Sequence, residues 1–420
     1  MGLSPRFSRM SVPEKREYLL NNQFTRSSLP GNNDEDYLWI CDVMVENAVG
    51  YAGLPLGITA PIRIDGQDYL VPMATEEASV IAAASYGGKM ASLDGGFVTS
   101  PPQPLIKGHL YYANTTLSQA EKLMNAVTIA IDKASPMLSS MQKRGGGLES
   151  WDFFYLKNPD CHVIEITLNV CDSMGANLMN SYLEKLSDML LELSGKKADI
   201  AILSNEASCR TGKAEFRISL DKIKRAGRYD MSAEEIGKKL VFLSEVAEHF
   251  PPRAVTHNKG IMNGITALAL ATGNDTRAIE ASVHSYACSS GVYKGLATYK
   301  IEKDFLTGHI KAPVPFAAIG GSIAFTDYSR FSMDILGNPS SRQLASIALA
   351  LGLAQNFAAL LALSTRGIQA GHMKLHAKKI AYQAGARGRQ IQTIADLLNK
   401  EKNYKQEFAE ELLKTNGKDD

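Results

Sequence analysis

The chain has 420 residues, enough for two or three domains with a sizeable hydrophobic core. Its 45 basic and 44 acidic residues nearly balance, so charge gives no reason to expect a nucleic-acid partner or a membrane surface. The five cysteines are scattered without a C-x-x-C pair, which favours a reducing compartment and argues against a structural zinc site.

The N-terminal region is predicted to be mainly helical and to lack a targeting segment. Ser11-Val-Pro-Glu14 has the spacing of a capping box, which predicts a short helix to about Leu20. No apolar signal region precedes it, and the longest apolar run, 344–363, is interrupted by polar residues. We therefore expect a soluble cytoplasmic protein. Further on, Asp65-Gly66 predicts a hairpin, and the small residues of 78–90 predict a closely packed helix.

Residues 104–205 carry the clearest supersecondary pattern. Strands are predicted at 105–113, 151–156, 163–170 and 200–203, with helices at 116–134 and 174–193. The order β-α-β-β-α-β is the ferredoxin-like arrangement. We interpret it as a small domain inserted into a larger one, and we expect its sheet to extend through Ala214–Leu220.

The stretch 254–287 reads as a loop, a buried helix, a tight turn and a second helix. Gly273 is placed to end the first helix in a left-handed turn, and Asn274 or Asp275 can cap the second. Lys259 and Asn263 lie just outside the apolar run. A lysine held against a buried helix is costly unless function requires it, but spacing alone supports a solvated lysine equally well.

The tail beyond residue 367 is more charged and is broken by glycines. Residues 389–414 predict two short amphipathic helices, which could form a lid or a frayed helix pair.

Five motifs, taken together, resemble one enzyme family. Thr256-His-Asn-Lys259-Gly-Ile-Met-Asn263-Gly264, followed by Gly273-Asn-Asp275, is similar to the catalytic segment of class II 3-hydroxy-3-methylglutaryl-coenzyme A (HMG-CoA) reductases. Further segments match other motifs of that family: Glu46-Asn-Ala-Val-Gly50, Pro72-Met-Ala-Thr-Glu-Glu77, Asp172-Ser-Met-Gly-Ala-Asn177, and Gly371-His372-Met373 with His376.

The resemblance implies an α+β fold and a set of site residues. The implied large, mainly helical substrate-binding domain comprises 1–107 and 218–366, with a ferredoxin-like nucleotide-binding domain at 108–217 and a helical flap at 367–420. The implied catalytic residues are Glu77, Lys259, Asp275 and His372. The implied substrate-binding residues are Glu46, Ser79, Asn205, Arg253 and Asn263, and the implied cofactor-binding residues are Asp172, Met174, Gly175, Ala176 and Asn177.

Each implied role has a chemical basis. A charged lysine can stabilise an oxygen that gains negative charge, a partly buried glutamate can donate a proton, and a histidine can protonate a departing thiolate. A glycine at a helix start lets a pyrophosphate approach free N–H groups, although Met-Gly-Ala alone is more often helix packing.

The implied reaction reduces HMG-CoA to mevalonate and coenzyme A with NADPH or NADH, in a homodimer or higher oligomer with shared active sites. The nearest acid before the triple glycine is Asp132, which leaves the choice of nucleotide open. No nucleic-acid or membrane partner and no metal are implied.

Two alternatives stay open. The same site could run in the catabolic direction and oxidise mevalonate with NAD and coenzyme A. From another class, the ferredoxin-like sheet could stack RNA bases on Trp151, Phe153 and Tyr155, although the chain has no basic stripe.

Overall fold

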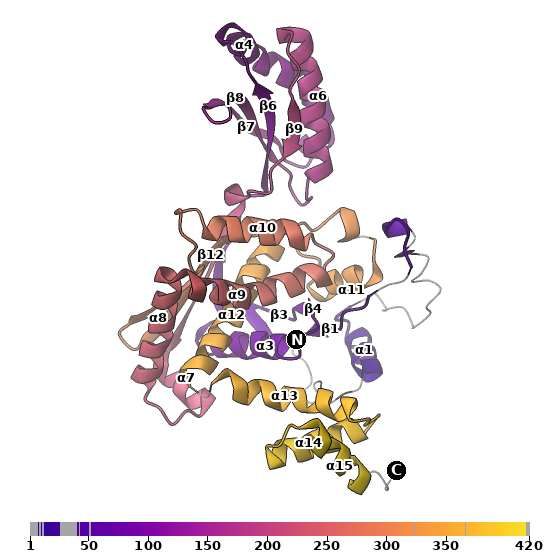
Figure 1. The fold of residues 1–420 in the computed structure, drawn as a ribbon, viewed down its shortest axis with the longest axis vertical. Helices are drawn as coiled ribbons and strands as arrows, with labels where there is room; N and C mark the ends of the chain where they lie inside the picture. The colour runs from indigo at the N-terminus through magenta and orange to yellow at the C-terminus, as the bar shows by residue number, and fades with distance from the viewer. Residues whose placement is uncertain are drawn as a thin grey trace.

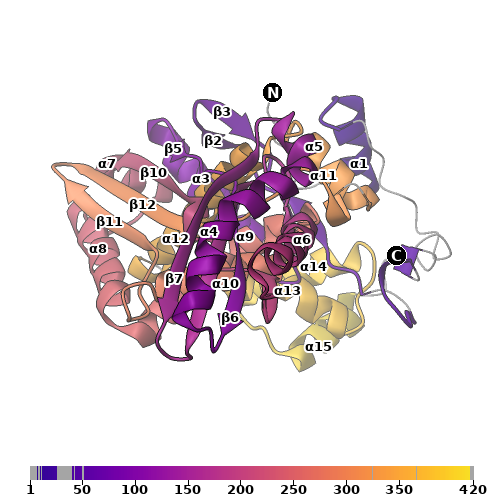
Figure 2. The same cartoon turned by 90° about the horizontal axis from the view of Figure 1, so that it is seen from above.

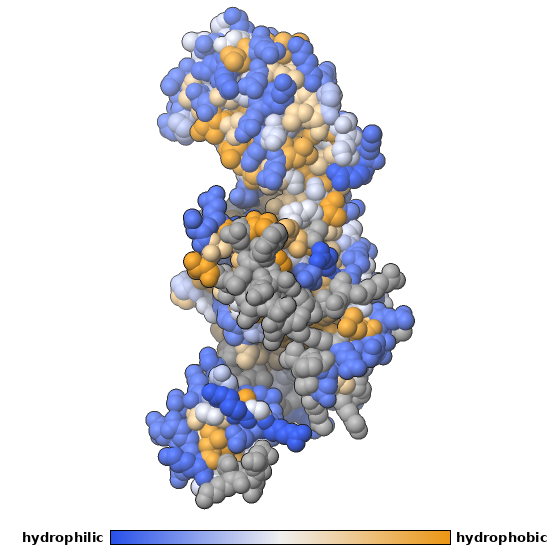
Figure 3. Space-filling view, turned by 90° about the vertical axis from the view of Figure 1, so that its right-hand side faces the viewer, coloured by the Kyte–Doolittle hydropathy of each residue, from blue (hydrophilic) through white to orange (hydrophobic). Residues whose placement is uncertain are grey.

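The computed structural model describes residues 7, 10, 12–25, 40–41, 43–49, 52–323, 325–365 and 367–416, with the backbone alone at 12, 13, 16, 368–375 and 416. A small unit stands at one end of the molecule, a large unit fills the middle, and the C-terminal helices lie at the other end (Figure 1). The space-filling view shows the small unit and the C-terminal helices as lobes at opposite ends (Figure 3).

The small unit has the predicted ferredoxin-like order. Its elements are β6 (Leu105–Ala113), α4 (Leu117–Ala134), η3 (Ser135–Leu138), α5 (Ser139–Gln142), β7 (Gly147–Leu156), β8 (Cys161–Asn169), α6 (Ala176–Ser194) and β9 (Ile200–Leu203). The antiparallel sheet runs β7-β8-β6-β9. α4 and α6 pack side by side along one face (Figures 1 and 2). α4 begins where the sequence predicts, because Thr116 and Gln119 form a capping box.

Of the three aromatic residues on which the RNA alternative depends, two are packed against the core and only Tyr155 is exposed. Trp151 and Phe153 pack against the hydrophobic core between the sheet and the two helices. The ring of Phe153 stacks on that of His162, with centroids 5.4 Å apart, and Tyr155 contacts the same imidazole. Base stacking along this strand needs open ring faces, which Trp151 and Phe153 do not offer, so this alternative loses its support.

The large unit is built on a six-stranded sheet ordered β11-β12-β10-β5-β2-β3. Its strands are β1 (Leu56–Ile58), β2 (Ile62–Ile64), β3 (Gln67–Tyr69), β4 (Pro72–Ala74), β5 (Phe97–Ser100), β10 (Thr211–Ser219), β11 (Ala297–Glu302) and β12 (Phe305–Pro313), with β1 and β4 forming a separate pair. Its helices are α1 (Val12–Asn21), α3 (Val80–Ala91), η2 (Ser92–Asp94), η4 (Ser208–Arg210), α7 (Leu220–Gly227), α8 (Ala233–His249), α9 (Pro251–Ala271), α10 (Thr276–Ala287), η5 (Gly321–Ile323), α11 (Asp327–Ile335) and α12 (Ser341–Ser364). Most of its regular structure is helical, as the resemblance implies, and the helices pack around this sheet.

The prediction that the small-domain sheet extends through Ala214–Leu220 is wrong. β10 pairs with β12 on one side and β5 on the other, inside the large sheet. Its Phe216 ring lies 4.6 Å from that of Phe357 and 5.5 Å from that of Phe97, between centroids. Alternating side chains identify a strand, but burial against α12 decides which sheet it joins.

The central core helix is α12. Within the described part of the chain it is the single helix long and apolar enough to cross a membrane, and 94% of its apolar window is buried inside the protein. The predicted small-residue helix, α3, packs against it so closely that a Cβ on Gly87 would lie 2.0 Å from the carbonyl oxygen of Ala354. Glycine therefore allows the two helix backbones to meet.

The central stretch differs from its prediction at the start. The expected loop at 254 is already helical, because Pro251 and Pro252 occupy the first positions of α9. Proline favours that position, where its missing N–H leaves no bond unmade. The remainder agrees with prediction: Gly273 has φ +69°, and the Asp275 carboxylate caps α10.

The C-terminal helices form a separate small core. They are α13 (Ile368–Gln383), α14 (Gln390–Glu401) and α15 (Gln406–Asn416), and they meet through buried side chains such as Ala381, Leu398 and Ala409.

Candidate active site

One face of α9 presents Lys259, Asn263 and Thr266 in successive turns. Lys259 points outward because its two predecessors are anchored inward. The buried His257 imidazole contacts the Ala297 carbonyl through Nε2 at 3.1 Å, and burial lowers the pKa of His257 to about 4. The Asn258 amide donates to the Lys294 carbonyl at 2.8 Å and accepts from the Leu296 N–H at 2.9 Å.

Glu77 faces Lys259 from the turn between β4 and α3. The Lys259 Nζ donates to Glu77 Oε2 at 3.5 Å, and the Ser79 hydroxyl donates to Oε1 at 3.1 Å. The side chains of Lys259 and Glu77 are 63% and 39% exposed, so solvent and ligands reach both. An exposed pair of this kind adds little stability, which favours a functional role for the contact.

These groups line a cavity of about 250 Å³ between α9, α10 and the segment 74–80. Its lining residues are Ala74, Thr75, Glu76, Glu77, Val80, Lys259, Met262, Asn263, Thr266, Ala267, Leu270, Glu280 and His284. The cavity thus combines one cation, several carboxylates and an amide on a partly apolar floor, which suits a polar acyl group.

Three polar residues of this cavity were missed by sequence reasoning. The Thr266 hydroxyl donates to Glu280 Oε1 at 2.6 Å, and His284 Nε2 lies 2.9 Å from Glu280 Oε2. Burial raises the pKa of Glu280, but the hydrogen bonds from His284 and Thr266 outweigh it and hold that pKa below its usual value. The spacing of Glu280 and His284, one helical turn apart, was the available signal.

Asp275 does not reach this cavity within one chain. Its Oδ1 accepts the N–H groups of Arg277 at 3.0 Å and Ala278 at 3.1 Å, which fixes it at the start of α10. Lys259 lies twelve residues before Ala271, the end of α9, which at about 1.5 Å per residue is a separation of about 18 Å. The acid–cation–acid set implied by the motifs is therefore divided between two places.

Three implied substrate-binding residues also lie away from the cavity. Burial lowers the pKa of the half-buried Arg253, which does not line the cavity. Asn205 accepts the Ser282 hydroxyl through its backbone carbonyl at 2.7 Å, and Glu46 is exposed in the described segment 43–49. Asn263 and Ser79 are the implied substrate-binding residues found at the cavity or beside Glu77.

The implied nucleotide-binding segment, 172–177, connects β8 to α6. Gly175 has φ +81° at the N-cap of α6, and a Cβ there would lie 2.4 Å from Val170 Cγ1. Met174 packs against the core of the large unit, whereas Asn177 is exposed. The start of α6 is accessible there, which fits a pyrophosphate on its N–H groups. His372 lies in α13, where the backbone alone is described, so its side-chain role stays a prediction.

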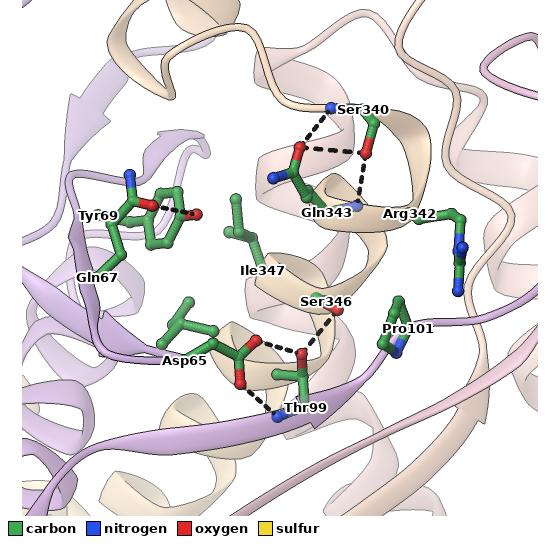
Figure 4. Close-up of a pocket in the computed structure, with 11 residues that line it drawn as sticks. Asp65, Gln67, Tyr69, Thr99, Pro101, Ser340, Arg342, Gln343, Ser346 and Ile347 are labelled. Atoms are coloured by element: carbon green, nitrogen blue, oxygen red, sulfur yellow. Dashed lines mark hydrogen bonds between the residues drawn. The ribbon is translucent and has the colours of Figure 1, made fainter.

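A larger cavity, of about 380 Å³, lies between the β2–β3 hairpin, β5 and the start of α12 (Figure 4). Its polar groups bond to one another: the Thr99 hydroxyl contacts Asp65 and Ser346, and Ser340 forms a capping box with Gln343. Size alone does not make an active site, and the smaller cavity holds the reactive groups.

Comparison with known proteins identifies the family. Residues 11–377 match the family model described as hydroxymethylglutaryl-coenzyme A reductase. The chain is 36% identical to 3-hydroxy-3-methylglutaryl-coenzyme A reductase of Archaeoglobus fulgidus, over 97% of this chain and 93% of that protein. It is also 36% identical to the probable reductase of Borreliella burgdorferi, over 91% of this chain and 87% of that protein.

Solved structures of the Streptococcus pneumoniae reductase share the fold. One covers 98% of this chain and 100% of its own, with a TM-score of 0.79 and 36% identity. Another, a class II reductase bound to NADPH in open conformations, has a TM-score of 0.77 at 36% identity and covers 97% of this chain and 99% of its own. The chain therefore belongs to class II of the HMG-CoA reductase family.

Proposed function

We propose that the cavity holding Lys259, Glu77 and Asn263 is where this enzyme reduces the thioester carbonyl of HMG-CoA. The observation that carries the proposal is the Lys259–Glu77 contact, at 3.5 Å, inside a cavity that also presents the Asn263 amide. The overall reaction converts HMG-CoA, two reduced nicotinamide dinucleotides and two protons to mevalonate, coenzyme A and the oxidised nucleotides. We infer the reductive direction, because the matching family and the relatives are named as reductases, and the catabolic alternative is not favoured.

We assign roles to Lys259, Glu77 and His372 in this reaction sequence. The bound nicotinamide dinucleotide supplies a hydride in each half-reaction. The Lys259 ammonium stabilises the carbonyl oxygen while that oxygen gains negative charge, and the contact with Glu77 orients the ammonium. The resulting hemithioacetal releases coenzyme A as a thiolate, which His372 protonates, and leaves mevaldehyde. A second reduction gives the alkoxide of mevalonate, and Glu77 delivers its proton.

We further propose that the active form is a homodimer or higher oligomer with shared sites. Within one chain the cavity carries Lys259 and Glu77, whereas Asp275 lies at the other end of α9, on the side of the 172–177 segment. A symmetric dimer can bring the cavity of one subunit to Asp275 of its partner. The exposed valines 43, 45 and 49 beside Glu46 support a subunit contact there, since they are 62%, 61% and 102% exposed.

The flap, the domain roles and the cellular location are proposals of the same kind. The separate core of α13–α15 lets these helices act as a lid that carries His372. The accessible start of α6 supports nucleotide binding by the small unit. The five free cysteines support a cytoplasmic location.

One assay tests the proposed reaction. Purified enzyme is mixed with HMG-CoA and either NADPH or NADH, and the nicotinamide absorbance is followed. We expect HMG-CoA-dependent oxidation of two nucleotides for each mevalonate formed, and the two initial rates establish the preferred nucleotide. An absence of oxidation with both nucleotides would overturn the proposal.

A further inference from the structure

A short segment after β12, residues 314–319, lies between two parts of the proposed site. It contacts the turn that carries Asp275 and the proposed nucleotide-binding segment 172–177. On one side it meets the turn that carries Asp275. The Ala317 N–H donates to Asn274 Oδ1 at 2.8 Å, and the Asn274 amide donates to the Thr272 hydroxyl at 3.0 Å. Asn274 is buried, with 7% of its surface exposed, so water does not replace these bonds easily.

On the other side the same segment meets the 172–177 segment. The Asp172 carbonyl accepts the N–H groups of Ala318 at 2.8 Å and Ile319 at 3.2 Å, and Ser173 forms a parallel bridge with Ile319. The Asp172 carboxylate accepts the Ser341 N–H, at the first residue of α12, at 2.7 Å. A carboxylate at a helix N-terminus is stabilised by the unpaired N–H groups and by the helix dipole.

A third contact fixes the start of the segment. The Arg210 side chain is buried, and its Nη2 donates to the Phe316 carbonyl at 2.8 Å. The Arg210 carbonyl in turn accepts the Val314 N–H at 3.4 Å. Burying a charged guanidinium costs desolvation free energy. The burial of Arg210 at this position is therefore consistent with a need to hold the segment rigid.

We propose that Asp172 and Asn274 are positioning residues that clamp the segment 314–319 between the nucleotide-binding segment and the turn before Asp275. The clamp fixes the position of the Asp275 carboxylate relative to the bound nicotinamide. In this proposal the Asp172 carboxylate binds the N-terminus of α12 and does not contact the nucleotide. This inference rests on the proposed assignment of 172–177 to nucleotide binding. Hydride transfer needs a near-attack geometry, and a displacement of about 1 Å can cost on the order of 10²-fold in rate.

The test separates nucleotide binding from the hydride step. Nucleotide affinity is measured by titration. The rate of the hydride step is measured as a single turnover of nucleotide oxidation, in enzyme that is saturated with nucleotide and HMG-CoA. For Asp172→Ala we expect the single-turnover rate to fall about 10- to 100-fold while the nucleotide dissociation constant changes less than about 3-fold. Asp172→Asn keeps an oxygen that accepts the Ser341 N–H, so it should recover most of the rate.

Asn274→Ala tests the clamp from its other side and keeps the inference testable if Asp172→Ala does not fold. It should slow the same step, whereas Asn274→Asp keeps the acceptor for Ala317 and should recover the rate. The double variant Asp172→Ala/Asn274→Ala should lose no more than the larger single loss, because both residues act through one segment.

Two matched controls remove a similar bond from the small unit alone. Asp199 accepts the Ala113 N–H at 2.8 Å, and Asn180 accepts the Leu203 N–H at 2.9 Å. Asp199→Ala and Asn180→Ala should lower the melting temperature without changing the single-turnover rate of the folded enzyme.

Three results would overturn the proposed clamp. The first is a nucleotide dissociation constant that rises by about 10- to 100-fold, the factor expected for the rate. The others are an unchanged single-turnover rate in the variants and losses that multiply in the double variant. The wild-type reaction is measured first, because its absence would contradict the reductase function and not the clamp.

Discussion

The Lys259 ammonium and the Glu77 carboxylate meet at 3.5 Å, although 182 positions separate them in the chain. β4 delivers Glu77 to the face of α9 from which Lys259 projects, since β4 packs directly on that helix. The two side chains are also free to engage a ligand, because both are partly exposed.

Replacing Lys259 by Ala should remove turnover without unfolding the protein. Loss of a charge that stabilises a developing oxyanion costs on the order of 10²–10³-fold in kcat, whereas an exposed ion pair stabilises a fold by about 0.2–1 kcal/mol. The measurements are kcat with HMG-CoA and the melting temperature. Lys238→Ala is the matched control, because it breaks an exposed pair with Glu234 on α8 and should retain full activity. A near-normal kcat for Lys259→Ala would remove this residue from the mechanism.

Much of the fold could be predicted because its signals are local. Each of three local features depends on only a few neighbouring residues: the Thr116 capping box, the left-handed Gly273 and the Asp275 cap. Sheet membership is not local: β10 alternates like any half-buried strand, and burial against α12 assigns it to the large sheet.

The same limit applies to the site. The motifs identify Lys259 and Asp275 but do not reveal that α9 holds them at opposite ends. The Thr266–Glu280–His284 contacts depend on how α9 packs beside α10, which single-sequence patterns do not encode.

Glu280→Gln should reduce the loss of folding stability that occurs as the pH falls into the acid range. Burial raises the pKa of Glu280, but the hydrogen bonds from His284 and Thr266 prevail, so the folded-state pKa is below the unfolded value of about 4.3. Ionised Glu280 therefore stabilises the fold above that value, and the contribution is lost as the pH falls through the folded-state pKa. Melting temperatures of the two proteins should differ most near pH 6–7 and converge in acid. A gap of constant size at every pH would contradict this linkage.

His372→Gln should separate the two half-reactions. The first reduction ends with departure of a coenzyme A thiolate, whose thiol has a pKa of about 8.5, so a nearby proton donor assists it. Reduction of mevaldehyde releases no thiolate and needs only Lys259 and Glu77. Loss of a general acid costs on the order of 10²–10⁴-fold, and we expect that loss with HMG-CoA but a substantial rate with free mevaldehyde. Both substrates are assayed on one preparation, and a parallel fall of the two rates would make His372 structural or common to both steps.

Mixed dimers should reveal whether a site uses residues from two subunits. Lys259→Ala and Asp275→Ala should each be inactive as homodimers if both groups are needed. Co-expression with two different affinity tags allows the mixed species to be purified in two steps.

If the site pairs Lys259 of one subunit with Asp275 of the other, each mixed dimer has one site that lacks both groups and one that is intact. By the two-fold symmetry of such a dimer, turnover should then recover to about half of the wild-type value. If both groups came from a single chain, neither site of the mixed dimer would be complete. An inactive mixed dimer would therefore contradict the shared site, and an active Asp275→Ala homodimer would show that this carboxylate is dispensable. Recovery is expected because α9 holds Lys259 and the Asp275 turn about 18 Å apart, too far for one oxygen to touch both within a chain.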